Sequence, residues 1–255
     1  MTVISNLPDP ALAAEKLLAK AGIVGAPVDL TKVLSLWSNL FLVEEELDGT
    51  GYLLQIGELG AEILINKADR EERKRFTIAH ELGHWVLGIS LKKKIGHFSQ
   101  PKNVRYAEIE KWCDTFATNL LMPQAIVRAS LHQTDPMLAI DLVARAAASF
   151  RVSEEAFFIR TWEVLRIQIA YLQVSVVSGV KRFSVERSFA SAEAAAFLSD
   201  FVERSAIANQ AQNQPFVYFS IPSAEGNVRC VGRKVTPERM FMMLKWPDKR
   251  EDQAQ

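Results

Sequence analysis

Three features of this 255-residue sequence predict an α+β fold in two parts. The stretch from Arg75 to Gly88 has the apolar periodicity of a helix and contains a His-Glu-Leu-Gly-His pentad. Three short segments of strand-like composition precede it. From residue 167 onward the chain is rich in Ile, Val and Tyr and alternates in part, which is typical of further strands. We therefore expect a helical domain with a small antiparallel sheet packed on the pentad helix, followed by a smaller α+β domain.

The change in composition places the domain boundary after residue 166. The first domain then comprises residues 1–166, including helices across 124–166. The second comprises residues 167–255, which is within the usual size range of a domain. The second domain contains no internal repeat and no chemical motif. A ligand sensor, a substrate-recognition module and a dimer support are all compatible with it.

Overall composition argues against several classes of function. Lys and Arg together number 30 and balance 30 Asp and Glu, whereas a general nucleic-acid binder usually has a basic excess. The two cysteines, Cys113 and Cys230, lie far apart, so we expect no disulfide framework and a reducing, cytoplasmic location. Residues 1–12 lack the pattern of a signal peptide, and no apolar run approaches the length of a membrane span.

Two helices and three strands are expected before the pentad. Asp9 followed by proline marks the start of a helix that reaches about Ala21. Asp29 caps a second helix that continues to Trp37, and both helices carry apolar stripes typical of a core scaffold. The strands are expected over 40–45, 51–56 and 61–66, with Asp48-Gly49 as a hairpin turn between the first two.

The pentad helix, which is free of proline from residue 72 to 87, carries the predicted chemistry. His80 and His84 are four residues apart, so they share a face and can direct two imidazoles at one divalent metal, most often zinc. Glu81 follows the first histidine, so its carboxylate can reach a water at the metal rather than the metal itself. The alternative is a pair of histidines on an ordinary buried helix.

A third metal ligand is predicted on the next helix, which we expect over 106–122. Catalytic zinc usually takes three protein ligands and a water. Glu110 and Asp114 share one face of this helix, which suits a ligating carboxylate followed by a carboxylate that orients a ligand histidine. The alternative for Glu110 is a solvent-facing side chain. We expect Cys113 to be a small buried apolar residue and not a ligand.

The remaining segments carry weaker signals. In the loop over 91–103, the lysines at 92–94 are best explained as a solvated face, and His97 as a residue without a role. Ser153 is expected to cap a helix that continues to about residue 166. Phe150–Ser153 lies between two helices, as in a helix-turn-helix, but the second helix is apolar and poor in base-reading side chains. Further elements are expected in this order: strands over 167–178 and 182–189, a helix over 191–206, a polar linker over 209–214, a hairpin of 215–221 and 227–235, and a short helix from Thr236 to Trp246.

Three linked motifs resemble those of the ImmA/IrrE metallopeptidases. They are Ile63–Asn66 (I-L-I-N), Arg75–His84 (R-F-T-I-A-H-E-L-G-H) and Glu110–Pro123 (E-K-W-C-D-T-F-A-T-N-L-L-M-P). The resemblance covers roughly residues 10–165. Members of that family are zinc-dependent proteins of bacteria and mobile elements that regulate gene expression, and the best-known members cut a helix-turn-helix repressor.

The resemblance implies that residues 1–166 form an ImmA/IrrE-like metallopeptidase domain with His80, His84 and Glu110 as zinc ligands. It implies Glu81 as the catalytic base, with Asp114 as the carboxylate behind a ligand histidine. The expected protein is a zinc metalloendopeptidase that cleaves a regulatory protein, such as a helix-turn-helix transcriptional repressor, in a stress response. One alternative is a metal-binding regulator that acts by partner binding without proteolysis. A second is a DNA-binding regulator that uses the helices between residues 135 and 165.

Three points about the site stay open in the sequence. The oxyanion of the tetrahedral intermediate needs a donor, and the candidates are Tyr106, His97, Arg105 and His132. In zinc peptidases with such a helix, an edge strand can hold an extended peptide by main-chain pairing, for which the segment 60–66 is a candidate or else an ordinary internal strand. Trp112 and Cys113 stand where family members usually have small residues, which puts a bulky aromatic near the site.

Overall fold

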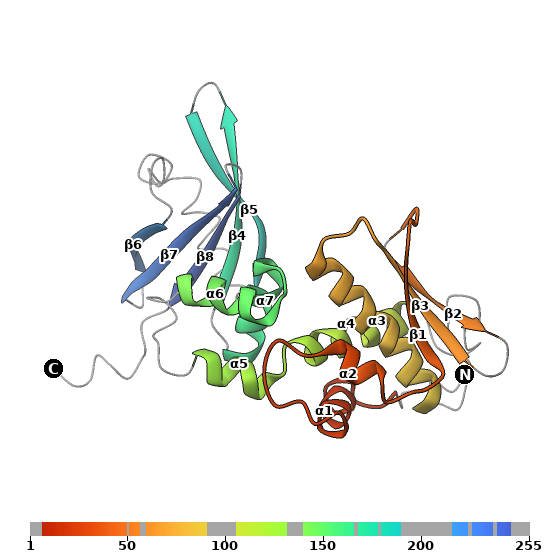
Figure 1. The fold of residues 1–255 in the computed structure, drawn as a ribbon. Helices are drawn as coiled ribbons and strands as arrows, with labels where there is room; N and C mark the ends of the chain where they lie inside the picture. The colour runs from red at the N-terminus through yellow and green to blue at the C-terminus, as the bar shows by residue number, and fades with distance from the viewer. Residues whose placement is uncertain are drawn as a thin grey trace, which may run out of the picture. The chain divides into compact units, whose positions relative to one another are not determined.

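The computed structural model describes residues 7–49, 51–56, 60–90, 106–131, 140–165, 168–177, 180–189, 216–223, 226–236 and 239–245. The elements are α1 (Pro10–Lys20), α2 (Leu30–Leu34), β1 (Leu40–Glu45), β2 (Gly51–Ile56), β3 (Gly60–Asn66), α3 (Glu71–Ser90), α4 (Tyr106–Leu121), α5 (Gln124–Leu131), α6 (Ile140–Phe150), α7 (Glu154–Leu165), β4 (Gln168–Val177), β5 (Val180–Phe189), β6 (Phe216–Ser223), β7 (Gly226–Thr236) and β8 (Arg239–Lys245). The predicted α+β class is confirmed (Figure 1).

The chain divides into two compact units. One comprises residues 1–130 and 146–156, and the other comprises residues 131–145 and 157–255. The units therefore exchange short segments around α6 and α7, and the domain boundary at residue 166 stays a prediction. Among the described helices, none combines the length and the apolar character needed to cross a membrane.

The two N-terminal helices begin where their capping residues predict. The Asp9 carboxylate accepts a hydrogen bond from the Leu12 amide at 2.8 Å, and the Asp29 carboxylate accepts one from the Lys32 amide at 3.0 Å. Each bond satisfies an amide that has no partner inside its helix. The apolar stripes are buried as expected, although α2 ends at Leu34 and the chain continues to Trp37 in turns.

The sheet of the first unit is mixed, with strand order β1-β3-β2. β3 runs parallel to β1 and antiparallel to β2, so the predicted hairpin and the predicted antiparallel sheet are wrong in this respect. The physical reason is burial, because the residues from Ile63 to Ile65 are buried on both faces and therefore occupy the central position. The Asn66 side chain donates to the carbonyls of Leu47 at 2.8 Å and Gly49 at 2.9 Å, which fixes the β1–β2 connection near the end of β3.

The central position of β3 also corrects its candidate role. Both of its edges are paired over 60–66, so β3 has no free edge on which to hold a peptide. β2 pairs with β3 along one edge and packs against α3. Within the described residues, β2 is thus the edge strand of this sheet that lies beside the pentad helix.

Helices α3 and α4 form the core of the first unit with the sheet and α1 (Figure 1). Arg75 is buried on α3 and donates to the Val28 carbonyl at 2.8 Å, which ties this helix to the segment before α2. Trp112 is buried on α4, stacks on Phe116 with ring centroids 5.3 Å apart, and donates its indole N–H to the Pro8 carbonyl. The bulky aromatic therefore anchors the N-terminal segment.

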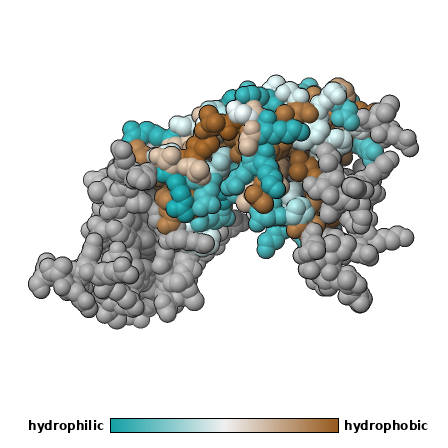
Figure 2. Space-filling view, turned by 90° about the horizontal axis from the view of Figure 1, so that it is seen from below, coloured by the Kyte–Doolittle hydropathy of each residue, from teal (hydrophilic) through white to brown (hydrophobic). Residues whose placement is uncertain are grey.

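Large apolar side chains also reach the surface of the first unit. On the face seen in Figure 2, apolar and hydrophilic side chains are interspersed. The exposed large apolar residues are Leu12, Val24, Phe41, Leu42, Leu54, Ile56 and Tyr106. Phe41 and Leu54 both lie opposite Glu62 of the central strand, so they belong to the same face of the sheet.

The second unit contains a five-stranded sheet with order β5-β4-β8-β7-β6, in which every neighbouring pair is antiparallel. The predicted strands and the predicted hairpin of β6 and β7 are confirmed. The short helix predicted over 236–246 is wrong, because Arg239–Lys245 is strand β8. β8 pairs on both sides, with β4 and β7, and this pairing overrides the helical preference of its Met and Leu residues. The predicted helix over 191–206, the linker over 209–214 and the loop over 91–103 lie outside the described residues.

Replacing Asn66 with Asp should lower the free energy of unfolding of the first unit by about 1–3 kcal/mol. The change removes the amide donor and places a carboxylate against two carbonyl oxygens. Urea unfolding followed by tryptophan fluorescence measures the effect, with Asn39→Asp as a control substitution outside this contact. An Asn66→Asp variant as stable as the parent would show that the β1–β2 connection does not depend on this side chain.

Candidate metal centre

The residues of the candidate site come from two adjacent helices. α3 supplies His80, Glu81 and His84, and α4 supplies Glu110 and Asp114. α3 is a continuous helix of 20 residues with Glu71 and Glu72 in its first turn, where acidic side chains favour helix formation. The two histidines therefore lie one turn apart on the side that faces α4, as their spacing predicts.

The three predicted ligands converge on a common point. The Nε2 atoms of His80 and His84 are 3.2 Å apart. The two carboxylate oxygens of Glu110 lie 3.2 Å from His80 Nε2 and 3.3 Å from His84 Nε2. Donor atoms bound to a tetrahedral zinc at its usual bond lengths are separated by roughly 3.4 Å. The spacing of these donors therefore fits a zinc-sized ion.

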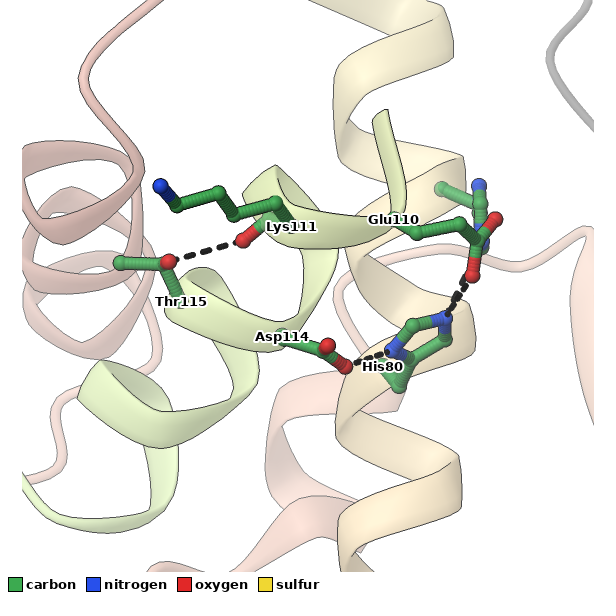
Figure 3. A network of polar contacts seen from close by, with 6 residues as sticks. His80, Glu110, Lys111, Asp114 and Thr115 are labelled. Carbon is green, nitrogen blue, oxygen red and sulfur yellow. Dashed lines mark hydrogen bonds and ion pairs between the residues drawn. The ribbon is translucent and has the colours of Figure 1, made fainter. Parts of the chain in front are cut away.

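The hydrogen bond of His80 also points to a cation between the donors. His80 Nδ1 lies 2.8 Å from an Asp114 carboxylate oxygen, as Figure 3 shows. Since Nδ1 donates to this oxygen, the Nε2 of a neutral imidazole carries a lone pair, which faces the carboxylate of Glu110. Two electron-rich atoms at this distance repel each other unless a positive charge lies near both. A proton or a metal ion meets this requirement.

The electrostatics of His80 reflect the same cluster of charges. Burial alone would lower the pKa of His80, but the hydrogen bond of Asp114 and the negative charges of Glu81, Asp114 and Glu110 together raise it. A site that stabilises a proton on an imidazole by three carboxylates can stabilise a divalent cation by the same charges. The donor set therefore suits a metal ion.

Glu81 is buried beside the converging donors. Only 3% of its surface is exposed, and its charge contributes to the raised pKa of His80 behind the larger effects already described. It follows His80 directly on α3 and is absent from the group of side chains whose ligand atoms converge. Its position is therefore that of an acid–base residue next to the metal position.

Tyr106 is the one oxyanion candidate that the structure describes. It begins α4, one turn before Glu110, and is 41% exposed. Burial and then the charge and hydrogen bond of Glu110 raise the pKa of its phenol, with Glu81 contributing. The other three candidates, His97, Arg105 and His132, lie outside the described residues.

A close crossing of α3 and α4 sets the distance between the ligands. A methyl group at Gly83 would lie 3.2 Å from the Cα of Cys113 and 3.2 Å from a ring carbon of Phe116. Cys113 is fully buried, which raises the pKa of its thiol, so its predicted role as a buried apolar residue is confirmed. The sequence analysis did not single out Gly83, although a glycine inside a helical pattern is a recognised sign of close packing.

A helix that carries H-E-x-x-H, with a carboxylate from the next helix facing both histidines, is the arrangement of a metallopeptidase domain. Residues 43–161 match the peptidase M78 family, whose domain is described as IrrE N-terminal-like. The chain belongs to the ImmA/IrrE family of metallopeptidases.

One curated relative and one solved structure support this grouping. The chain is 37% identical over 76 residues to the radiation response metalloprotease IrrE of Deinococcus radiodurans. The aligned stretch covers 29% of this chain and 23% of the length of that relative. A transcriptional regulator of Mycobacterium tuberculosis is similar in fold, with a TM-score of 0.56 and 14% identity, over 92% of this chain and 74% of that one.

Replacing Gly83 with Ala should weaken zinc binding by about tenfold, at the lower end of what disturbed support of a metal ligand produces. The added methyl group meets the backbone of Cys113, so α4 and the ligand Glu110 must shift by a few tenths of an ångström. Competition with a chromophoric chelator measures the affinity, with the exposed α3 substitution Glu72→Ala as control. Helix propensity alone would make the variant more stable by about 1 kcal/mol, and unchanged affinity together with such a gain would contradict the prediction.

Proposed function

We propose that this chain is a zinc endopeptidase that cleaves a regulatory protein, such as a helix-turn-helix transcriptional repressor. The convergence of His80, His84 and Glu110 beside the buried Glu81 is the observation that carries the proposal. Membership of a metallopeptidase family supports hydrolysis, and the name of the Deinococcus relative supports a role in a stress response. Zinc is the proposed ion because two imidazoles and one carboxylate form a usual catalytic zinc set.

His80, His84 and Glu110 would hold the ion, which when bound would polarise the scissile carbonyl and lower the pKa of water. Asp114 accepts the Nδ1 proton of His80 and thereby keeps the other nitrogen available as a ligand. Glu81 would take a proton from the attacking water as its oxygen bonds to the carbonyl carbon. It would then deliver that proton to the leaving amine as the C–N bond breaks.

The edge strand β2 is the proposed support for an extended substrate. It lies against α3, and within the described chain its second edge has no strand partner. An extended peptide could pair with this edge through its main chain and bring a scissile bond to the adjacent helix. This role replaces the one considered for residues 60–66, and it favours an unfolded or locally opened segment as the substrate.

The second unit is proposed as a sensory or substrate-recognition module. Its antiparallel sheet forms a separate set of strands from those around the pentad helix. The cytoplasmic location and the absence of direct nucleic-acid contact stay predictions, which rest on the cysteine content and the balanced charge.

Replacing Glu81 with Gln should lower the rate of peptide cleavage by about 100- to 10,000-fold, the usual contribution of a general base. Zinc binding should persist, because Glu81 lies outside the converging donors. Cleavage of the product of a neighbouring repressor gene, or of a peptide library, gives the rate, and metal analysis gives the zinc content. Glu108→Gln, which removes an exposed carboxylate from α4, is the matched control.

The same variants separate the proposal from a metal-binding regulator without proteolysis. In that alternative, Glu81→Gln keeps full biological function, while His80→Ala abolishes it through loss of the metal. A parent chain that binds one zinc ion but cleaves no repressor or library peptide would support the alternative.

Zinc should stabilise the first unit selectively. At free zinc one hundred times its dissociation constant, the native state gains about 2.7 kcal/mol. Calorimetry of the full chain should therefore show an unfolding transition that shifts upward with zinc and downward with a chelator, and one that does not move. His80→Ala should abolish the shift. A single transition that responds as a whole would contradict independent unfolding of the two units.

A further inference from the structure

Two rows of side chains meet at the metal centre. Tyr106, Glu110 and Asp114 are each four residues apart on α4, so they lie along one face of that helix. The facing row on α3 includes His80 and His84, whose ring centroids are 5.0 Å apart. Asp114 already has a partner in this arrangement, because it accepts a hydrogen bond from His80. The middle residue of the α4 row, Glu110, has Tyr106 on its N-terminal side.

The phenol of Tyr106 forms a hydrogen bond with the carboxylate of Glu110. A protonated phenol is the donor and the carboxylate the acceptor. The two oxygens of Glu110 also face His80 and His84 at 3.2 and 3.3 Å. A carboxylate has about four acceptor positions, so Glu110 can accept this bond and still direct lone pairs at the point between the histidines.

The length of the glutamate side chain explains why such a partner matters. A Glu side chain loses up to about 2 kcal/mol of rotamer entropy when it is fixed, and a quarter of the Glu110 side chain is exposed to solvent. A hydrogen bond that selects the required rotamer before the ion arrives reduces this cost at the binding step. Groups that orient metal ligands typically contribute about 10- to 100-fold to metal affinity.

We propose that Tyr106 is a positioning residue, whose hydroxyl holds Glu110 in its ligating orientation as Asp114 does for His80. The inference deepens the proposed function and rests on its assignment of Glu110 as a metal ligand. It takes Tyr106 out of the group of oxyanion candidates and gives it a role in the free enzyme. Nothing in the motif itself requires a tyrosine at this position, since it lies outside the residues from Glu110 to Pro123.

The test is the zinc affinity of full-length Tyr106→Phe, measured by competition with a chromophoric chelator. The substitution removes one oxygen atom at a partly exposed position, so the apoprotein should unfold at the same temperature as the parent. The dissociation constant for zinc should rise about 10- to 100-fold. The visible spectrum of the cobalt-substituted protein should change as well, because the carboxylate ligand is less constrained. Tyr52→Phe, on β2, removes a tyrosine hydroxyl elsewhere in the same unit and should change neither quantity.

A second variant separates the hydroxyl from the ring. Tyr106→Leu keeps an apolar side chain and should lose as much affinity as Tyr106→Phe. Full affinity in Tyr106→Phe with a loss in Tyr106→Leu would assign the effect to ring packing and overturn the proposal. Unchanged zinc affinity with a lower kcat in Tyr106→Phe would show that the hydroxyl acts on the reacting groups, which also overturns it.

Failure of the proposed function gives a different result. If the parent chain binds no zinc, or if Glu110→Gln leaves its zinc affinity unchanged, the assigned metal centre is wrong. If the parent binds zinc, Glu110→Gln weakens binding and Tyr106→Phe does not, only the role of Tyr106 is wrong.

Discussion

The close crossing of α3 and α4 is the constraint on which the rest of the site depends. Two ligands lie on one helix and the third on the other, so the distance between the helices decides whether the donors can share an ion. Gly83 permits this approach, because a methyl group there would meet Cys113 and Phe116 at 3.2 Å. Glycine inside a helix is less favourable than alanine by about 1 kcal/mol. The local cost is thus connected directly to the geometry of the metal centre.

The crossing is fixed from outside by contacts at other points of the two helices. Arg75 ties α3 to the Val28 carbonyl, and Trp112 ties α4 to the Pro8 carbonyl. Both side chains are buried, so their hydrogen bonds satisfy polar groups that water does not reach. Within this frame, Asp114 and Tyr106 orient a histidine and a carboxylate respectively. A site built on two rigid helices needs little rearrangement to accept an ion.

Several errors of prediction share one cause, which is that pairing between distant segments outweighs local pattern. Residues 40–45 and 51–56 flank a good turn sequence, yet β3 takes the place between them because it buries both of its faces. Arg239–Lys245 has residues common in helices, yet it forms β8 because β4 and β7 supply partners on both edges. Trp112 is unusual for its position in the motif, and only the packing against Phe116 and Pro8 explains it.

The sequence by itself determined the features that depend on spacing within one helix: the shared face of His80 and His84, the pairing of positions 110 and 114, and the caps at Asp9 and Asp29. These features follow from a period of 3.6 residues and from the unpaired amides at helix ends, both of which are local. Only the tertiary structure decided that Glu110 faces both histidines, that Gly83 adjoins Cys113 and that β2 is the edge strand beside α3. These contacts join residues far apart in the chain, and which of them form depends on how all the elements bury their apolar faces together.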